Sequence, residues 1–302
     1  LVVPKEKSAR ATAAIAQSQR PIEASEVGRA RGRLAIVGIG PGPQSWRTSE
    51  CERALAEASD VVGYGLYLDL LGTALAGKRR HQSALGEEET RVRLAFSLAA
   101  EGRNVALVSS GDAGIYGLAA LAFELLESLD RDAPERRIEM SVVPGVSALQ
   151  AAAARAGAPL GHDFAAVSLS DLLTPWPEIE RRLLACAAAD FVLALYNPAS
   201  MRRRDRIARA REILLEHRKP ETPVVIARNL GRAGETVEIM RLDEDWAERI
   251  DMLTLVLVGN SRTRRFEAGG RPWVLTPRGY ALKLEGHADR PTHPAPLKLA
   301  PR

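Results

Sequence analysis

The stretch SSGDAGIYG at residues 109–117 combines hydrogen-bonding side chains with glycines that leave the backbone accessible. It follows the apolar run VALV and precedes a helical pattern, so Ser109, Ser110 and Asp112 are expected where a buried strand ends. Asp112 can cap the following helix, or it can accept hydrogen bonds from a cationic or hydroxylated ligand beside Gly111. The residues of this stretch leave both interpretations open.

A second glycine turn, VGIGPG at residues 37–42, follows another apolar run. Its three glycines permit a tight turn and leave backbone N–H groups accessible. The turn departs from the dinucleotide-binding pattern G-x-G-x-x-G, because Pro43 stands where the third glycine belongs and because prolines supply no N–H donor. The sequence also lacks a G-x-x-x-x-G-K-[ST] phosphate loop. These departures disfavour a Rossmann dinucleotide-binding fold.

Three further polar breaks interrupt the apolar pattern. Ser147 stands near a helix start in VPGVSAL, Tyr196 and Asn197 end an apolar run in LALYNPAS, and a short loop lies within residues 227–236. In open α/β sheets, ligands bind where strands end and helices begin. These breaks are therefore candidate ligand-binding positions.

Apolar runs and helical patterns alternate through most of the chain. The apolar runs are continuous, which is typical of parallel strands that are buried on both faces. We expect strands at 33–40, 60–64, 104–110, 137–143, 164–170, 190–197, 222–229, 235–242 and 252–259, and helices at 46–58, 87–102, 115–129, 146–157, 179–189 and 203–218.

Two features indicate how these elements are organised. The turn at Pro144 and Gly145 divides the alternating pattern into two halves. In the second half, the short loop LGRAG joins two expected strands without a helix, which predicts a hairpin and a mixed sheet. The expected fold class is α/β, with a tail at 1–32, an N-terminal α/β lobe at 33–143, a C-terminal α/β lobe at 144–277 and a tail at 278–302.

The composition limits the classes of partner. The 302 residues are 46% hydrophobic and 26% charged, as in ordinary globular proteins. A net charge of +4 is too small to indicate nucleic acid, but it suits a polyanionic small substrate. Cys51 and Cys186 indicate neither a disulfide framework nor a metal site. Because the chain lacks an apolar run of roughly 18 residues and the apolar core of a secretory signal, we expect a cytoplasmic protein without a membrane partner.

Five motifs in this order resemble the tetrapyrrole methyltransferase family: VGIGPG, SSGDAGIYG, PGVSALQAAAARAGAPLGHDF, SLSDLLTPW and LYNPAS. The resemblance spans residues 33 to about 266 and is most specific for the branch that acts on precorrin-3B in cobalamin biosynthesis. It implies two α/β lobes with a ligand cleft between them, a homodimer, and S-adenosylmethionine (SAM) bound in a folded form. The implied reaction methylates C17 of precorrin-3B and contracts the ring to precorrin-4. Contact with neighbouring enzymes of the pathway is a further expectation.

The resemblance also implies which residues contact SAM. The chain has Ala113 where many relatives have proline, and Asn197 where relatives often have methionine. Both differences match the narrower branch, so they bear on the substrate more than on the cofactor. The implied contacts are Pro41, Gly111, Asp112, Ile115, Ser147, Ala148, Tyr196, Asn197, Leu230 and Thr254.

A precorrin is flat, apolar at its centre and rimmed with carboxylates, so its site needs cationic edges. Arginine suits this role because its guanidinium forms paired hydrogen bonds with carboxylates. The basic cluster at 201–211 is a weaker candidate, since a charge run on a helix is usually a solvated face. The candidate substrate-binding residues are Arg79, Arg80, Thr174, Arg228 and Arg232.

The implied ring contraction converts the C20 hydroxyl to a ketone and extrudes C20 as an acetyl group, which requires a base near that hydroxyl. Ser170, Asp171 and His81 are the catalytic candidates. Asp171 can instead cap a helix. His81 is expected in a loop, where a surface histidine is the commoner outcome.

Several alternatives stay open at this point. The substrate can carry cobalt, as cobalt-factor III of the anaerobic route does, or the methyl group can go to another precorrin carbon. An RNA methyltransferase or RNA-binding module belongs to a different class, and the 5% aromatic content and lack of a long basic stripe argue against it. The N-terminal stretch LVVPKEKSARATAAIA is similar to the end of the cobalamin G-type protein family, which is compatible with a fusion or a neighbouring pathway gene.

Overall fold

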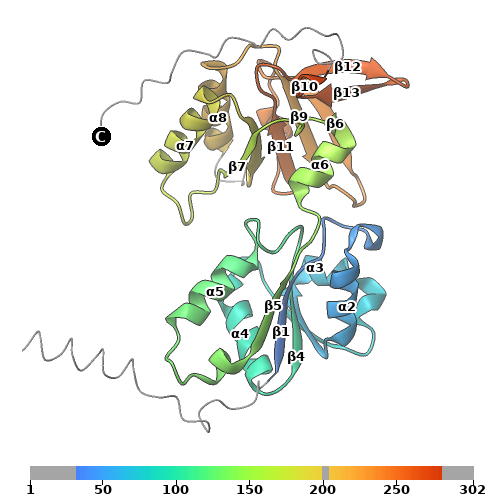
Figure 1. The fold of residues 1–302 in the computed structure, drawn as a ribbon, viewed down its shortest axis with the longest axis vertical. Coiled ribbons are helices and arrows are strands. Elements are labelled where there is room, and N and C mark those ends of the chain that lie inside the picture. Colours follow the sequence, from blue (N-terminus) through green and yellow to red (C-terminus); the bar gives the residue numbers. More distant parts are fainter. Residues whose placement is uncertain (1–31, 199–203, 281–302) are drawn as a thin grey trace, which may run out of the picture. The chain divides into compact units, whose positions relative to one another are not determined.

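The computed structural model describes residues 32–198 and 204–280 (Figure 1). Nearly all of the two predicted tails, and residues 201–203 of the basic cluster, lie outside the described residues. The chain divides into two compact units, Leu1–Val146 and Ser147–Arg302, and each unit is described separately below.

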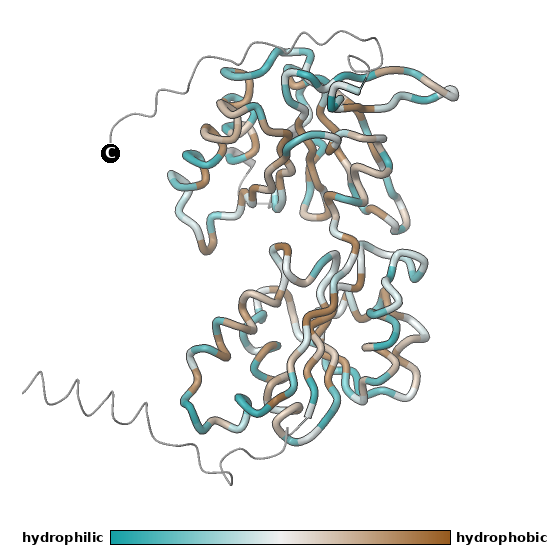
Figure 2. Tube along the Cα trace, in the orientation of Figure 1, coloured by the Kyte–Doolittle hydropathy of each residue, from teal (hydrophilic) through white to brown (hydrophobic). Residues whose placement is uncertain are grey.

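Unit 1 contains a five-stranded parallel sheet with the strand order β3-β2-β4-β1-β5. Continuous apolar runs form its inner strands because both faces of the sheet are covered, and Figure 2 shows hydrophobic residues concentrated there. The strands are β1 (Arg33–Gly38), β2 (Asp60–Tyr64), β3 (Arg79–Ser83), β4 (Asn104–Ser109) and β5 (Glu139–Val143).

Helices pack on both faces of the unit 1 sheet. Leu34, Ile36 and Leu107 form a core with helices α4 and α5, whereas Val37 and Val108 form a second core with α2 and α3. This division follows from the alternation of side chains along a strand. The helices are α2 (Ser49–Glu57), α3 (Gly65–Asp69), α4 (Glu88–Ala100) and α5 (Leu118–Ser128).

Unit 2 contains a mixed sheet with the strand order β10-β9-β11-β8-β7. Strands β7 and β8 are parallel, whereas β11 runs antiparallel to both of its neighbours. The predicted hairpin is confirmed, since β9 and β10 are antiparallel neighbours. The strands are β7 (Phe164–Ser168), β8 (Val192–Tyr196), β9 (Pro223–Arg228), β10 (Thr236–Arg241) and β11 (Thr254–Val258).

Among the described residues, three α-helices pack against the unit 2 sheet. Leu183 of α7 and Ile213 of α8 are fully buried against Leu195, Ile226 and Val256 of the strands. Helix α6 packs against β9, β10 and β11. The helices are α6 (Ala148–Ala156), α7 (Trp176–Ala188) and α8 (Arg204–Leu215).

A second, three-stranded sheet in unit 2 was not expected from the sequence. A hairpin of β12 (Arg264–Ala268) and β13 (Arg271–Leu275) projects from the unit, and β13 pairs at its base with β6 (Gly157–Ala158) (Figure 1). Gly157 is required at this junction because its φ is 124° and a Cβ there would lie 2.8 Å from the carbonyl oxygen of Val274.

Candidate functional site

Three glycines bring the loops at the carboxyl edge of the unit 1 sheet into close contact. A Cβ on Gly145 would lie 2.2 Å from the carbonyl oxygen of Gly111, and one on Gly38 would lie 2.7 Å from the same oxygen. Gly40 and Gly111 also exchange two backbone hydrogen bonds of 3.0 and 2.9 Å. We call Gly38, Gly111 and Gly145 the glycine junction. Because no side chain fits there, the backbone of these loops stays uncovered.

Asp112 lies half-buried beside the glycine junction. Its Oδ1 accepts a hydrogen bond from the N–H of Gly114 at 2.8 Å, and its Oδ2 accepts one from the N–H of Gly145 at 3.0 Å. The helix-cap interpretation of Asp112 is wrong, because Leu118 at the start of α5 donates to Ser109 Oγ at 3.2 Å. Each carboxylate oxygen can accept a further hydrogen bond, so Asp112 remains suited to a ligand with O–H or N–H groups.

Apolar surface lies next to these polar groups in the same loop. Ile115 is 37% exposed and Tyr116 is 53% exposed, and Tyr116 has a φ of 52°. Pro41, in the first glycine turn, is buried. The loop therefore offers a carboxylate, bare backbone and apolar side chains together.

The start of α6 gathers three of the predicted SAM contacts in unit 2. Ser147 caps the helix and forms a capping box with Gln150, so its hydroxyl accepts from the N–H of Gln150 and its own N–H donates to the Gln150 side chain. Ala148 is the first helical residue. The hydroxyl of Tyr196 accepts a hydrogen bond from the N–H of Leu149 at 3.2 Å, which joins the end of β8 to the start of α6.

The ends of β7 and β8 are joined through Ser168, a residue that the sequence analysis did not single out. Asn197 has a φ of 50° and donates from Nδ2 to Ser168 Oγ at 3.0 Å. Ser168 Oγ also accepts from the N–H of Ser170 at 3.3 Å. Ser168 lies two residues before Ser170, at the end of an apolar run, and this position could have identified it from the sequence.

Asp171 is not a helix cap, contrary to one of the two sequence interpretations. Helix α7 starts at Trp176, with Pro175 at the capping position. Asp171 instead accepts a hydrogen bond from Arg206 at 3.2 Å, and the guanidinium of Arg206 lies over the Trp176 ring at 4.7 Å. In the same loop, which also carries Thr174, Leu172 and Leu173 are 76% and 98% exposed.

The end of β9, the β9–β10 loop and the start of β11 carry four further predicted residues. Leu230 is buried, and Thr254 Oγ1 donates to Asp251 Oδ1 at 2.7 Å. Arg228 lies 3.7 Å from Asp251. The N–H of Arg232 donates to the carbonyl of Asn229 at 2.8 Å, which closes the turn.

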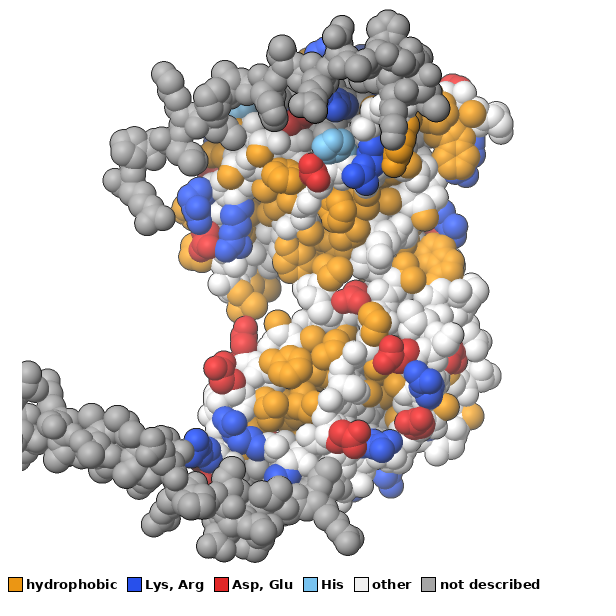
Figure 3. Space-filling model, in the orientation of Figure 1, with side chains coloured by type: hydrophobic (Ala, Val, Ile, Leu, Met, Phe, Trp, Pro, Cys, Tyr) orange, Lys and Arg blue, Asp and Glu red, His pale blue; other side chains and the backbone are white. Residues whose placement is uncertain are grey.

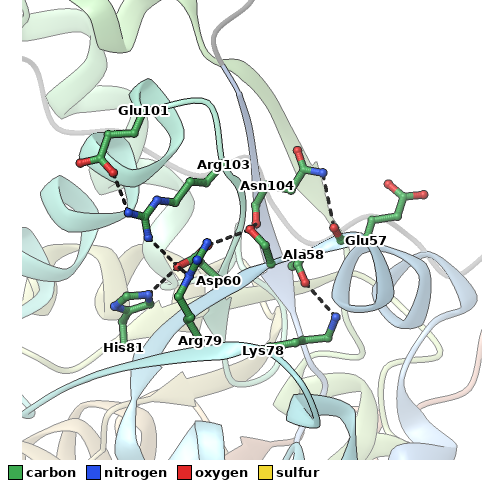
Figure 4. Close-up of polar contacts among 10 residues, drawn as sticks. Glu57, Ala58, Asp60, Lys78, Arg79, His81, Glu101, Arg103 and Asn104 are labelled. Atoms are coloured by element: carbon green, nitrogen blue, oxygen red, sulfur yellow. Dashed lines mark hydrogen bonds and ion pairs between the residues drawn. The ribbon is translucent and has the colours of Figure 1, made fainter.

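Asp60 is the first residue of β2 and the centre of a polar network (Figure 4). This network lies at the opposite end of the unit 1 strands from the glycine junction. Its fully buried carboxylate accepts from both Nε and Nη2 of Arg79 at 2.8 and 2.7 Å, and it also contacts Arg103 and His81. The hydrogen bond from Arg79 is the main cause that holds the pKa of Asp60 well below its usual range.

His81 was expected in a loop, and this expectation is wrong, because His81 lies within strand β3. Its Nε2 lies 2.8 Å from Asp60 Oδ1. Arg80, its neighbour, contacts Asp69 at 2.7 Å. Since Asp60 and Arg79 begin their strands and the glycine junction follows strand ends, the structure does not bring Arg79 or His81 together with Asp112.

A family model, Tetrapyrrole (Corrin/Porphyrin) Methylases, matches residues 33–244 of the chain. The chain belongs to this tetrapyrrole methylase family. The match includes the glycine junction, Asp112 and the start of α6.

The curated relatives of this tetrapyrrole methylase include a cobalamin biosynthesis protein and two C(17)-methyltransferases. The cobalamin biosynthesis protein CobIJ of Mycobacterium bovis is 44% identical over 269 residues, which cover 85% of this chain and 52% of CobIJ. This chain therefore spans about half the length of that relative. A precorrin-3B C(17)-methyltransferase of a Sinorhizobium species and a probable cobalt-factor III C(17)-methyltransferase of Salmonella typhimurium are each 43% identical, and cover 83% and 82% of this chain and 98% and 100% of their own lengths.

Solved structures agree with the tetrapyrrole methylase fold. The crystal structure of the methyltransferase CobJ superposes with a TM-score of 0.75 and 41% identity, and covers 82% of this chain and 100% of that one. A uroporphyrin-III C-methyltransferase from Thermus thermophilus, complexed with S-adenosylhomocysteine, has a TM-score of 0.59 and 25% identity, and covers 76% of this chain and 97% of that one.

Two surface observations bear on other partners of this tetrapyrrole methylase. On the face drawn in Figure 3, basic and acidic side chains are interspersed over each unit, without a continuous basic stripe among the described residues. Within residues 32–198 and 204–280, no helix has the length and apolar character needed to cross a membrane.

Proposed function

We propose that this chain is a SAM-dependent methyltransferase that methylates C17 of precorrin-3B and contracts its ring to precorrin-4. The observation that carries the proposal is the glycine junction with Asp112 beside it, in a chain that matches a precorrin-3B C(17)-methyltransferase over 98% of that relative's length. The five sequence motifs that resemble the tetrapyrrole methyltransferase family support the same reaction.

The described residues fit SAM in chemical terms. The adenosine and methionine parts of SAM carry hydroxyl, amino and ammonium donors, and Asp112 offers acceptor sites for such groups at the uncovered backbone of the glycine junction. Ile115 and Tyr116 supply exposed apolar surface for the flat adenine ring. We propose that Pro41, Gly111, Asp112 and Ile115 contact SAM from unit 1, and that Ser147, Ala148, Tyr196, Asn197, Leu230 and Thr254 contact it from unit 2.

The main task of these residues is to bind and orient. SAM, when bound, supplies a methyl group on a sulfonium that needs no activation by the protein. Fixing the donor and the macrocycle in one geometry can lower a barrier by about 7–11 kcal/mol in ideal cases. Capping by Ser147 and the Tyr196 hydrogen bond hold the start of α6 in place, so these residues supply a fixed backbone surface.

The remaining roles concern the substrate. Arg228 is half-exposed, and we propose that Arg228 and Arg232 bind the carboxylates at the macrocycle rim. We propose Asp171 as the base for the C20 hydroxyl, flanked by Ser170 and Thr174. Arg206 lies 3.2 Å from the Asp171 carboxylate and fixes its position. We propose no substrate-binding or catalytic role for Arg79 and His81, because both contact Asp60 in its polar network.

A cobalt-containing substrate is the second candidate. It is favoured by the equal 43% identity to the probable cobalt-factor III C(17)-methyltransferase of Salmonella typhimurium. We further propose a homodimer and a cytoplasmic location, as the resemblance and the composition predict.

The deciding experiment incubates the purified chain with SAM and either precorrin-3B or cobalt-factor III. The expected result is a product that gains one methyl group by mass and shows the absorbance change of a contracted ring with precorrin-3B. Turnover of only the cobalt compound supports the second candidate. Failure to methylate either compound, with SAM bound by the protein, contradicts the proposed substrate.

A further inference from the structure

Strand β12 leaves an open edge on unit 2. It is the terminal strand of its sheet and pairs only with β13 among the described strands. All five of its residues, Arg264–Ala268, are exposed. A strand edge of this kind presents unpaired N–H and C=O groups to another strand.

The hairpin turn determines which backbone groups face that edge. Gly269 and Gly270 have φ values of 62° and 76°, and they form a two-residue turn between Ala268 and Arg271. Residues that flank such a turn form a hydrogen-bonded pair, and pairs alternate along an antiparallel ladder. Arg265 and Glu267 therefore direct their backbone groups away from β13, toward the open edge.

We propose that β12 pairs antiparallel with β12 of a second copy of this chain, about a two-fold axis at Phe266. This inference rests on the homodimer proposed above and names its interface. In this register, Arg265 faces Glu267 of the partner subunit, and the two-fold axis repeats the pair. Both residues carry outward backbone groups, so these pairs are also the hydrogen-bonded ones.

The charged residues of β12 favour this register over registers with the two-fold axis at a neighbouring residue. Arg265 and Glu267 lie on one face of the strand, where they form an ion pair of 3.0 Å within one chain. A two-fold axis at residue 265 would set arginine against arginine, and an axis at residue 267 would set glutamate against glutamate. Like charges directly opposite one another destabilise strand pairing, whereas opposite charges stabilise it.

The other face of β12 is apolar at the proposed axis. Phe266 is 43% exposed, and its neighbour across the hairpin is Trp273. The guanidinium of Arg271, two residues before Trp273 on the same face of β13, stacks on the Trp273 ring at 3.4 Å. In the proposed register, Phe266 meets Phe266 of the partner subunit in a non-hydrogen-bonded pair, the closer of the two kinds of pair.

Cysteine cross-linking tests the register directly. Opposite Cβ atoms in an antiparallel pair lie about 4.5–5.5 Å apart, a distance that permits a disulfide after small adjustment. We expect Phe266→Cys to form a covalent dimer under mild oxidation. The matched control Arg264→Cys lies on the same face but would face Ala268 of the partner subunit, so it should stay uncross-linked. The unsubstituted chain reports any background from Cys51 and Cys186.

Charge reversal provides a second, non-covalent test. Arg265→Glu or Glu267→Arg alone should weaken dimerisation by roughly tenfold or more, because each places two like-charged pairs at the interface. The double variant R265E/E267R should restore dimerisation, since opposite charges face each other again. Sedimentation velocity over a range of protein concentrations measures the dissociation constant, and S-adenosylhomocysteine binding checks that each variant is folded.

A backbone variant separates edge pairing from side-chain effects. Glu267→Pro removes an outward N–H and leaves the groups facing β13 intact, so it should weaken the dimer while the melting temperature of the protein changes little.

These experiments have three distinguishable outcomes. Cross-linking of Phe266→Cys but not Arg264→Cys, with recovery by the double charge reversal, supports the interface. A dimer that is insensitive to all these variants overturns the interface and leaves the homodimer proposal standing. A chain that stays monomeric at every concentration overturns both, whereas the methylation assay is independent of either result.

Discussion

The carboxylate of Asp112 hydrogen-bonds the N–H of Gly145 at 3.0 Å, across a sequence separation of 33 residues. Its other oxygen accepts from the N–H of Gly114 at 2.8 Å. One side chain thus ties the loop after β4 to the loop after β5, at the position where SAM is proposed to bind. We therefore expect loop geometry and cofactor affinity to be coupled through Asp112.

Replacing Asp112 should affect both properties. We expect Asp112→Ala to destabilise the fold by about 1–3 kcal/mol, because two backbone N–H groups lose their acceptor. Affinity for S-adenosylhomocysteine should fall by roughly tenfold, or ~1.4 kcal/mol. Isothermal titration and urea unfolding measure the two effects, and Asp132→Ala, an exposed carboxylate of the same unit, is the control. Unchanged affinity in Asp112→Ala would refute its role in binding SAM.

The glycine junction should tolerate no side chain. Gly145→Ala places a Cβ 2.2 Å from the Gly111 carbonyl oxygen and 2.6 Å from that of Gly38, and backbone atoms cannot move aside cheaply. We expect a loss of roughly 3 kcal/mol or more in the free energy of unfolding. Gly114→Ala is the matched control, since its nearest contact is the Asp112 side chain at 3.2 Å. Equal stability of the two variants would contradict this account.

The Asp60 network should make stability depend on pH. The partners hold the pKa of Asp60 below that of an unfolded aspartate, so the folded state binds fewer protons than the unfolded state. This stabilisation is fully present above about pH 4, the unfolded pKa, and is lost as the pH falls toward the folded pKa.

The corresponding variant is Asp60→Asn. At pH 7 it should be roughly 2–3 kcal/mol less stable than the unsubstituted protein, because hydrogen bonds to a buried charge are lost. The difference should shrink steadily below pH 4. Denaturant unfolding at a series of pH values measures it, and a difference that stays constant down to acid pH would show that the charge of Asp60 is irrelevant.

Cys51 should be unreactive in the folded protein. Burial raises the pKa of its thiol to about 11, and its side chain is fully buried. At pH 8 the thiolate fraction is then about a hundredfold lower than for a thiol of ordinary pKa. In a Cys186→Ser variant, Ellman's reagent should modify Cys51 only after denaturant unfolds the chain. Modification of the native protein at the rate of a free thiol would contradict the structure.

Asp171 should act on ring contraction more than on cofactor binding. We expect Asp171→Ala to bind S-adenosylhomocysteine as tightly as the unsubstituted chain and to contract the ring about a hundredfold more slowly, the usual loss for a general base. Asp171→Asn is the control that keeps an oxygen for Arg206 and removes the base. Product mass and absorbance over time provide the measurement. If Asp171→Asn contracts the ring at the normal rate, Asp171 is not the base.

Much of the fold follows from local patterns in the chain. The run DVVGY predicts a buried strand, and β2 occupies the same residues, 60–64. The loop LGRAG predicts the β9–β10 hairpin, and the two strands are antiparallel neighbours. These predictions succeed because periodicity, turn residues and loop length act over a few residues. The glycine turns likewise indicate where a ligand or another chain segment can approach the backbone.

The elements that the sequence did not reveal depend on contacts between distant residues. The polar stretch RRHQS has no strand pattern, yet it forms β3, where Arg79 and His81 meet the buried carboxylate of Asp60. Asp112 proved to bind Gly145 rather than cap α5, and Asp171 proved to pair with Arg206, 35 residues away. Apolar periodicity and turn chemistry specify strands and loops locally, whereas the partner of a polar side chain is set when packing brings separate segments together.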